Sequence, residues 1–212
     1  MDLTIGGVFF SLLCEKAIYR ADRRILILSD LHLGKAAHFR KAGIYMPPDS
    51  ALKDYARFRL LMHKVQPEQV YILGDLFHST HNNEWDLFEA TIRSFPDVKF
   101  VLVLGNHDIL MHHHYEALNI TLVKKTLRED KIIYSHAPMD DLPEGCINIA
   151  GHIHPGVRLL GIADQSVTLP CFYLSNDCLL LPAFGYLTGL KVLKKERTAR
   201  VFAVTDSKVL EV

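Results

Sequence analysis

Short apolar runs with little polar interruption recur through the first two thirds of the chain. Five of them are Ile25–Ser29, Val70–Leu73, Lys99–Leu104, Ile132–Ser135 and Ile147–Ala150. Leucine and β-branched residues dominate these runs, which is typical of strands buried on both faces of a sheet. Further strands are predicted nearer the two ends, over Phe172–Leu174, Cys178–Leu181, Val201–Val204 and the hairpin-like stretch Leu3–Arg20.

Helical periodicity separates the early strands. The spacing predicts helices over Ser50–Val65, with Asp49 or Ser50 as N-cap, over Glu84–Ser94, and over a shorter stretch, Asp108–Leu118. The order is therefore βαβαβ followed by a β-rich half, which favours a layered α/β architecture with helices flanking two packed sheets. No repeat or linker divides the chain, so we expect one domain over residues 1–212.

Composition narrows the class of protein. The 24 basic residues balance the 24 acidic ones, which argues against a protein that coats nucleic acid nonspecifically. The four cysteines form no CxxC pair, so neither a zinc knuckle nor a disulfide framework is expected. The N-terminus has no basic leader region, and no apolar run reaches about 18 residues. A cytoplasmic location and no membrane span are therefore predicted.

Polar side chains follow each of the five early strands. In strand order they are Asp30 and His32, then Asp75 and His78, then Asn106, His107 and Asp108, then His136, then His152 and His154. Ligands of open α/β sheets bind outside the carboxyl ends of strands, so we expect these side chains at one rim. Glycines before Asp75, Asn106 and His152 would let the backbone turn sharply there.

Nitrogen and oxygen donors without a thiolate suit divalent manganese, iron or zinc. The donors are too many for one tetrahedral site and fit two ions, about 3.5–4 Å apart, that share a carboxylate. Each motif alone has an ordinary interpretation. GNHD can form a turn, and HIH can be a strand with two exposed imidazoles. Their order at successive strand ends favours the metal centre.

The series D-x-H, G-D-x-x-H, G-N-H-D, H and G-H-x-H, between Ile25 and His154, resembles the calcineurin-like metallophosphoesterase superfamily. The resemblance implies a four-layer α-β-β-α sandwich of two mixed β-sheets flanked by helices. It also implies two metal sets that share Asp75 as the bridge. One set is Asp30, His32, Asp75 and His154, and the other is Asp75, Asn106, His136 and His152. Ser135 departs from the pattern, since glycine often precedes the fourth motif's histidine.

The same resemblance implies hydrolysis of phosphoesters by a water that the two ions activate. His107 would lie near the leaving group and protonate it or stabilise its charge. Asp108 would orient the His107 imidazole, cap the following helix, or do both. His78 would contact Asp75 or the substrate, or lie at the surface where a helix begins.

A basic segment follows the first metal motif. We interpret Leu33 to Pro48 as a loop in which Lys35, His38, Arg40 and Lys41 hold additional phosphates, against the alternative of a solvated loop. Arg158, close behind His154, is either a further phosphate contact or an exposed strand residue.

Two stretches, SDLHLGKAAHFRKAGIYMP and LLLPAFGYLTGL, resemble the bacterial ligase-associated DNA-damage-response metallophosphoesterases. That branch is encoded beside a DNA ligase, a helicase and an exonuclease, so the resemblance implies functional association with them. It also implies a manganese-dependent phosphodiesterase or endonuclease acting on DNA. A small-molecule phosphoesterase acting on nucleotides or nucleotide pyrophosphates is the main alternative. A non-catalytic scaffold is disfavoured because every expected ligand position is filled. A homodimer is compatible with the sequence.

Overall fold

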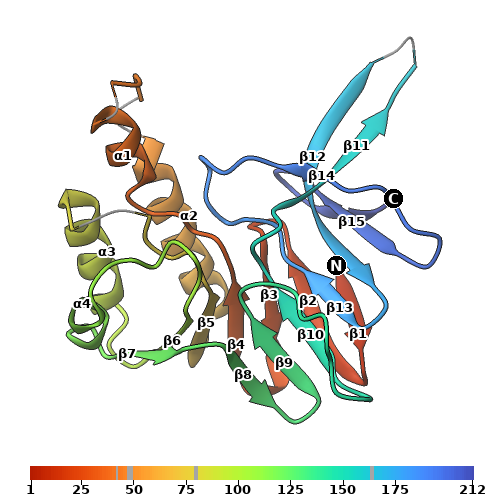
Figure 1. The fold of residues 1–212 in the computed structure, drawn as a ribbon, viewed down its shortest axis with the longest axis horizontal. Helices are drawn as coiled ribbons and strands as arrows, with labels where there is room; N and C mark the ends of the chain where they lie inside the picture. The colour runs from red at the N-terminus through yellow and green to blue at the C-terminus, as the bar shows by residue number, and fades with distance from the viewer. Residues whose placement is uncertain (42, 47–49, 79–80, 163–164) are drawn as a thin grey trace.

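Two mixed β-sheets form the framework of the computed structural model (Figure 1). The structure describes residues 1–41, 43–46, 50–78, 81–162 and 165–212. The first sheet has the order β1-β2-β3-β4-β5-β6-β7, with its first four strands antiparallel and β4 to β7 parallel. Its strands are β1 (Asp2–Ile5), β2 (Val8–Leu13), β3 (Ala17–Arg20), β4 (Ile25–Leu28), β5 (Gln69–Leu73), β6 (Lys99–Val103) and β7 (Ile120–Val123).

The second sheet has the order β14-β11-β12-β13-β10-β9-β8, and β15 joins β12 to β16. Within it β9, β10 and β13 run parallel to one another. The β11–β12 hairpin projects beyond the body of the molecule (Figure 1). The strands are β8 (Thr126–Glu129), β9 (Ile132–Ser135), β10 (Ile147–Ala150), β11 (Pro155–Leu160), β12 (Ser166–Ser175), β13 (Cys178–Leu180), β14 (Lys191–Val192), β15 (Arg200–Val204) and β16 (Val209–Glu211).

The helices lie on one side of the sandwich (Figure 1). They are the 3-10 turn η1 (Ala21–Arg23) and the helices α1 (Lys35–Lys41), α2 (Ser50–Val65), α3 (Asn83–Arg93) and α4 (His112–Glu116). None of these helices has the length and apolar character needed to cross a membrane. The two mixed sheets and the helical layer on the first sheet confirm the expected fold. The helical layer expected on the second sheet is absent from the described residues, where no helix follows Glu116.

Strand alternation explains how the layers form. In β4, Leu26 and Leu28 pack against the helices, whereas Ile25 and Ile27 point into the space between the sheets. Because successive side chains of a strand point to opposite faces, an uninterrupted apolar run buries both faces at once. The same alternation holds in β5 and β6. Among the described residues, the outer face of the second sheet has a small apolar cluster around Cys171, Tyr173 and Val201.

Two predicted boundaries were wrong. The segment from Leu33 to Pro48, expected to be a loop, contains α1. Pro48, and Asp49 as N-cap candidate of α2, lie outside the described residues. A distant carboxylate explains α1: Glu84 of α3 accepts the N–H groups of Gly34 and Ala37 at 2.8 and 2.9 Å, which satisfies the start of this short helix. The predicted Asp108–Leu118 helix is shortened to α4, because the chain from Asp108 to Met111 is extended or bent.

The inter-sheet core should dominate stability. Ile149 of β10 is fully buried between the sheets, so Ile149→Ala should lower the free energy of unfolding by about 2–5 kcal/mol. Leu160→Ala is the control, because Leu160 is 78% exposed on β11 and should change stability by less than about 0.5 kcal/mol. Urea denaturation measures both, and equal effects would contradict this assignment of the core.

Candidate metal centre

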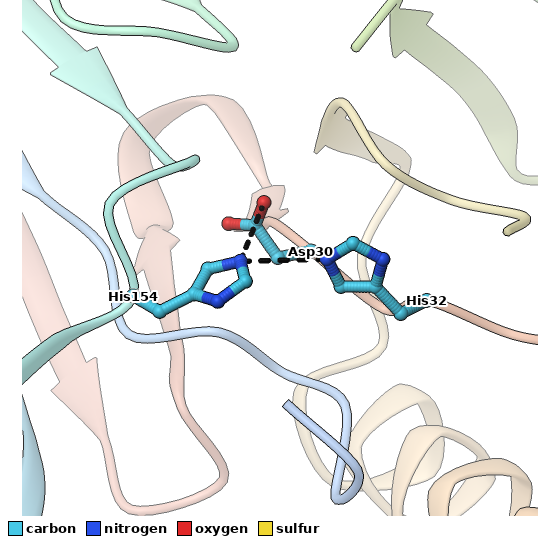
Figure 2. Close-up of side chains that lie close together, drawn as sticks. All are labelled: Asp30, His32 and His154. Atoms are coloured by element: carbon cyan, nitrogen blue, oxygen red, sulfur yellow. Dashed lines mark hydrogen bonds and ion pairs between the residues drawn. The ribbon is translucent and has the colours of Figure 1, made fainter. Parts of the chain in front are cut away.

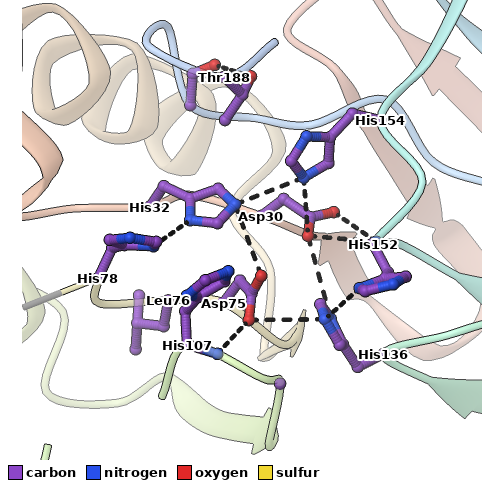
Figure 3. Close-up of polar contacts among 12 residues, drawn as sticks. Asp30, His32, Asp75, Leu76, His78, His107, His136, His152, His154 and Thr188 are labelled. Atoms are coloured by element: carbon purple, nitrogen blue, oxygen red, sulfur yellow. Dashed lines mark hydrogen bonds and ion pairs between the residues drawn. The ribbon is translucent and has the colours of Figure 1, made fainter. Parts of the chain in front are cut away.

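The predicted ligands meet where strands of both sheets end. Asp30 and His32 follow β4, Asp75 follows β5, and Asn106 and His107 follow β6. The second sheet contributes His136 after β9, and His152 and His154 after β10. Figure 3 shows the histidine and aspartate side chains converging from the two sheets. The convergence at one rim that the sequence predicts is therefore present in the structure.

One group of possible metal ligands consists of Asp30, His32 and His154, whose ligand atoms lie within 4.8 Å of one another (Figure 2). The Nε2 atom of His154 lies 3.3 Å from Oδ1 of Asp30 and 3.4 Å from Nε2 of His32. Two imidazole nitrogens that both present lone pairs repel each other at this distance. A cation bound between His32 and His154 would replace this contact.

A second group consists of Asp30, Asp75 and His136. The two oxygens of Asp75 face different histidines, with Oδ1 at 3.5 Å from Nε2 of His136 and Oδ2 at 3.5 Å from Nε2 of His32. His152 completes this side, its Nδ1 lying 3.1 Å from Nε2 of His136. Asp75 thus contacts one histidine of each implied metal set, as a bridging ligand must. In the two groups defined by distances between ligand atoms, however, the shared aspartate is Asp30.

Hydrogen bonds determine which imidazole nitrogens are available. Nδ1 of His136 lies 3.0 Å from the carbonyl oxygen of Leu73, an acceptor, so Nδ1 carries the proton and Nε2 presents its lone pair to the centre. Nδ1 of His32 lies 3.2 Å from Nδ1 of His78, while Nε2 of His32 faces Asp75 and His154. His78 therefore contacts the metal-ligand candidate His32.

The ligand backbone is strained. Asp30, His32, Asp75, His152 and His154 all have positive φ, between 47° and 67°. Non-glycine residues rarely adopt this region, and such conformations persist only where the surroundings fix them. At five of the predicted ligands the chain therefore adopts an unfavourable conformation in order to point polar side chains into one space.

Two glycines permit the close packing of these loops. Gly74 has a φ of 78°, and a Cβ there would collide with the ring of His136. A Cβ on Gly151 would collide with Asp30 and Ser29. The expectation that glycines allow close approach at Asp75 and His152 is confirmed, since both precede a ligand and both face another ligand.

The electrostatics favour a cation. Asp30 is fully buried and Asp75 is 2% exposed, and in the described part of the chain neither forms an ion pair with lysine or arginine. Burial, reinforced by the charge of Lys35, lowers the pKa of His32 to about 2, and burial lowers the pKa of His152. These imidazoles are neutral at pH 7, so their lone pairs are free to bind a cation. A buried donor set of carboxylate oxygens and neutral imidazoles fits divalent metal ions.

His107 and Asn106 lie at the exposed side of this cluster. The backbone N–H of His107 donates to Oδ1 of Asp75 at 2.9 Å, and its ring packs on His78 with centroids 4.0 Å apart. Asn106 is exposed, and its side chain makes no hydrogen bond with the part of the chain that the structure describes. Both residues are adjacent to Asp75, and their roles stay predictions.

Asp108 has a different role from either one expected. Its carboxylate accepts the backbone N–H groups of Asp75, Leu76, Phe77 and Gly105, at 2.8 to 3.3 Å. It makes no hydrogen bond with the His107 ring in the described chain, and Met111 is the N-cap of α4. Because two loops gather their N–H groups on one carboxylate, Asp108 holds the Asp75 loop in place.

The predicted substrate contacts separate into two groups. Lys35 is half-buried near the ligands. Burial lowers the pKa of Lys35, and the nearby carboxylate of Asp75 acts in the opposite direction. Arg40 instead pairs with the buried Glu84 at 3.1 Å, and Arg158 is exposed and donates to Ser166 at 3.0 Å. The side chains of His38 and Lys41 lie outside the described set.

Sequence reasoning assigned no role to Glu84, although it joins α3 to the start of α1 and to Arg40. A glutamate near a helix start suggests local capping, and nothing in the sequence indicates that its carboxylate caps a different helix. The segment around Phe184 was also left without a role. The N–H groups of Phe184 and Gly185 donate to the carbonyl oxygens of Ser29 and Asp30, at 2.9 and 3.0 Å.

The family model of the calcineurin-like phosphoesterases matches residues 23–170, more than half of the chain. This chain belongs to the calcineurin-like phosphoesterase family. It is thus a metal-dependent phosphoesterase, and the family match confirms the resemblance that its motifs indicate.

Two relatives of this calcineurin-like phosphoesterase are informative. The crystal structure of Pseudomonas putida nuclease MPE matches with a TM-score of 0.84 and 26% identity, over 100% of this chain and 99% of that one. Metallophosphoesterase 1 of Danio rerio is 33% identical over 100 residues, which are 42% of this chain. This chain spans only 25% of the length of that relative.

The Asp108 contacts yield a prediction. Asp108→Asn replaces one acceptor oxygen with an NH₂ group facing backbone donors, so it should lower the free energy of unfolding by about 1.5–3 kcal/mol. Asp130→Asn is the control, since the Asp130 side chain is 70% exposed. Urea denaturation measures both variants, and an Asp108 variant as stable as its control would contradict the assigned role.

Proposed function

We propose that this phosphoesterase is a manganese-dependent phosphodiesterase that cuts DNA as an endonuclease. The observation that carries the proposal is the convergence of Asp30, Asp75 and the histidines at one rim, in a chain that matches a nuclease structure over its whole length. A small-molecule phosphoesterase is the alternative, because the candidate metal ligands alone do not distinguish the two.

Asp30, His32, Asp75 and His154 would hold one ion, and Asp75, Asn106, His136 and His152 the other. Two divalent ions held there would supply the Lewis acidity that activates a water and neutralises phosphate oxygens. His107 would hold a proton for the leaving oxygen, and its exposure, its position beside Asp75 and its packing on the His78 ring support this role. Lys35 would bind a phosphate oxygen, a role that its electrostatic interaction with Asp75 supports.

The biological setting follows the proposed activity. We infer a role in DNA damage response, in association with the DNA ligase, helicase and exonuclease that accompany the ligase-associated branch. Manganese is proposed over iron or zinc on that branch resemblance. A cytoplasmic location and a homodimer remain predictions. Size-exclusion chromatography with light scattering measures the last of these.

Manganese-loaded protein should nick plasmid DNA and cut single-stranded oligonucleotides at internal positions, giving a ladder of products on a sequencing gel. Chromogenic phosphodiesters should also be hydrolysed. Hydrolysis of the small diester without any cleavage of DNA would favour the small-molecule alternative.

Asp75→Asn should reduce kcat for either substrate by about 10³-fold or more, the effect of losing several kcal/mol of transition-state stabilisation. The reason is that one carboxylate contacts histidines of both implied metal sets. Asp130→Asn serves as the control. Wild-type activity in a folded Asp75→Asn protein would contradict the proposed centre.

Lys35 and Arg40 form a matched pair of cations on α1. Lys35→Ala should raise KM for DNA about tenfold and reduce the slope of log KM against log salt concentration by about 1, because one phosphate contact is lost. Arg40→Ala should leave that slope unchanged, since Arg40 is paired with Glu84. Equal changes in the two variants would show that charge on α1, rather than the position of Lys35, determines binding.

A further inference from the structure

A groove separate from the metal centre lies at the same rim of the first sheet. It has a volume of about 500 Å³ and is lined by Lys16, Arg57, Leu169, Pro170, Tyr186 and Asp206, among others. This volume is within the range of about 300–1,000 Å³ that is usual for ligand pockets. Lys16 directly precedes β3, whose Ile18 pairs with Ile27 of β4, so the groove begins one strand away from Asp30.

The segment around Phe184 forms the wall between this groove and the metal centre. On one side the N–H of Gly185 donates to the carbonyl oxygen of the candidate ligand Asp30 at 3.0 Å. A Cβ at Gly185 would collide with the backbone of Leu31, so the segment lies directly against the ligand strand. The next residue, Tyr186, lines the groove. Tyr186 therefore directly follows the segment that contacts the Asp30 loop.

Tyr186 is held firmly although its ring is exposed. Its backbone N–H donates to both carboxylate oxygens of Asp54, at 2.9 and 3.1 Å, and Asp54 pairs with Arg57 at 2.7 Å. Arg57 also donates to the carbonyl oxygen of Phe184 and stacks over its ring at 4.2 Å. The Tyr186 residue nevertheless remains 56% exposed. A large ring whose backbone is anchored and which is left open to solvent is suited to stacking on a planar ligand.

The charges around the groove leave a cationic excess. Arg57 is neutralised by Asp54, and Glu15 is neutralised by Lys64 at 2.7 Å. Lys16 forms no ion pair within the described chain, and the ammonium of Lys53 lies 4.8 Å from the centroid of the Tyr186 ring. Asp206, which also lines the groove, offsets one of these two positive charges. An anionic ligand with a planar group complements this arrangement.

Building on the proposed DNA cleavage, we propose that this groove binds one nucleotide of single-stranded DNA next to the scissile phosphate. Tyr186 stacks on its base, and Lys16 and Lys53 contact the adjacent backbone phosphates. Burial, with the charge of Arg57, lowers the pKa of Lys16 to about 8, although Asp54 and Asp206 act in the opposite direction, so this half-buried ammonium is retained at a cost to the fold. A bound phosphate would compensate that cost.

The test compares DNA with a substrate too small to reach the groove. Binding of a fluorescent single-stranded oligonucleotide is measured by anisotropy in EDTA, and turnover with manganese is measured for the oligonucleotide and for bis-p-nitrophenyl phosphate. Tyr186→Ala should weaken oligonucleotide binding about 5- to 100-fold, the range for stacking of one base. Tyr186→Phe should bind as the wild type does, and neither variant should change turnover of the small diester.

Phe9→Ala is the matched control, because Phe9 is 49% exposed on β2 and does not line the groove. Lys16→Met gives an independent readout. It should weaken oligonucleotide binding while raising the Tm, because a poorly solvated charge is removed, whereas a residue with only a structural role would change the two in the same direction.

Unchanged oligonucleotide binding in Tyr186→Ala would overturn the proposal. Equal loss of turnover on both substrates would also overturn it, since Tyr186 would then act through the Asp30 loop. Competition by thymidine monophosphate as strong as competition by the oligonucleotide would assign the groove to a small nucleotide instead. If the wild type hydrolyses the small diester but neither binds nor cuts DNA, the proposed function fails together with the groove.

Discussion

Two buried carboxylates that form no ion pair with a lysine or arginine of the described chain are the constraint on which this site depends. Asp30 and Asp75 lie below the surface among imidazoles, and burial lowers the pKa of two of these, His32 and His152. Burying carboxylates that no lysine or arginine of the described chain pairs with is costly, and a bound cation would compensate this cost. The positive φ values at the ligands and the glycines at which a side chain would collide follow from the need to bring these groups into contact.

The rest of the molecule holds this arrangement in place. Parallel strands in both sheets end at the same rim, so their loops meet across the sandwich. Asp108 gathers the N–H groups of two loops, and Glu84 fixes the start of α1 beside Lys35. Asp108 and Glu84, which bind backbone N–H groups, therefore determine the positions of the predicted ligands and of Lys35.

Much of this arrangement was predictable from the sequence, because the predicted ligands directly follow the ends of strands. The apolar runs locate the strands, and the polar residues that follow them share a rim by the geometry of parallel sheets. Contacts between segments far apart in the chain were not predictable. Glu84 caps a helix about 50 residues before it, Asp108 binds a loop 33 residues before it, and Asp54 holds Tyr186, 132 residues after it. Such partners depend on tertiary packing, which local periodicity does not contain.

The central claim is that the rim binds two divalent cations through a shared carboxylate. Equilibrium dialysis of the metal-free protein against Mn²⁺, with the bound metal quantified by mass spectrometry, tests it most directly. The account predicts two ions per chain for the wild type, and loss of tight binding of both in Asp75→Asn. One ion or none in the wild type, or two tightly bound ions in Asp75→Asn, would contradict it.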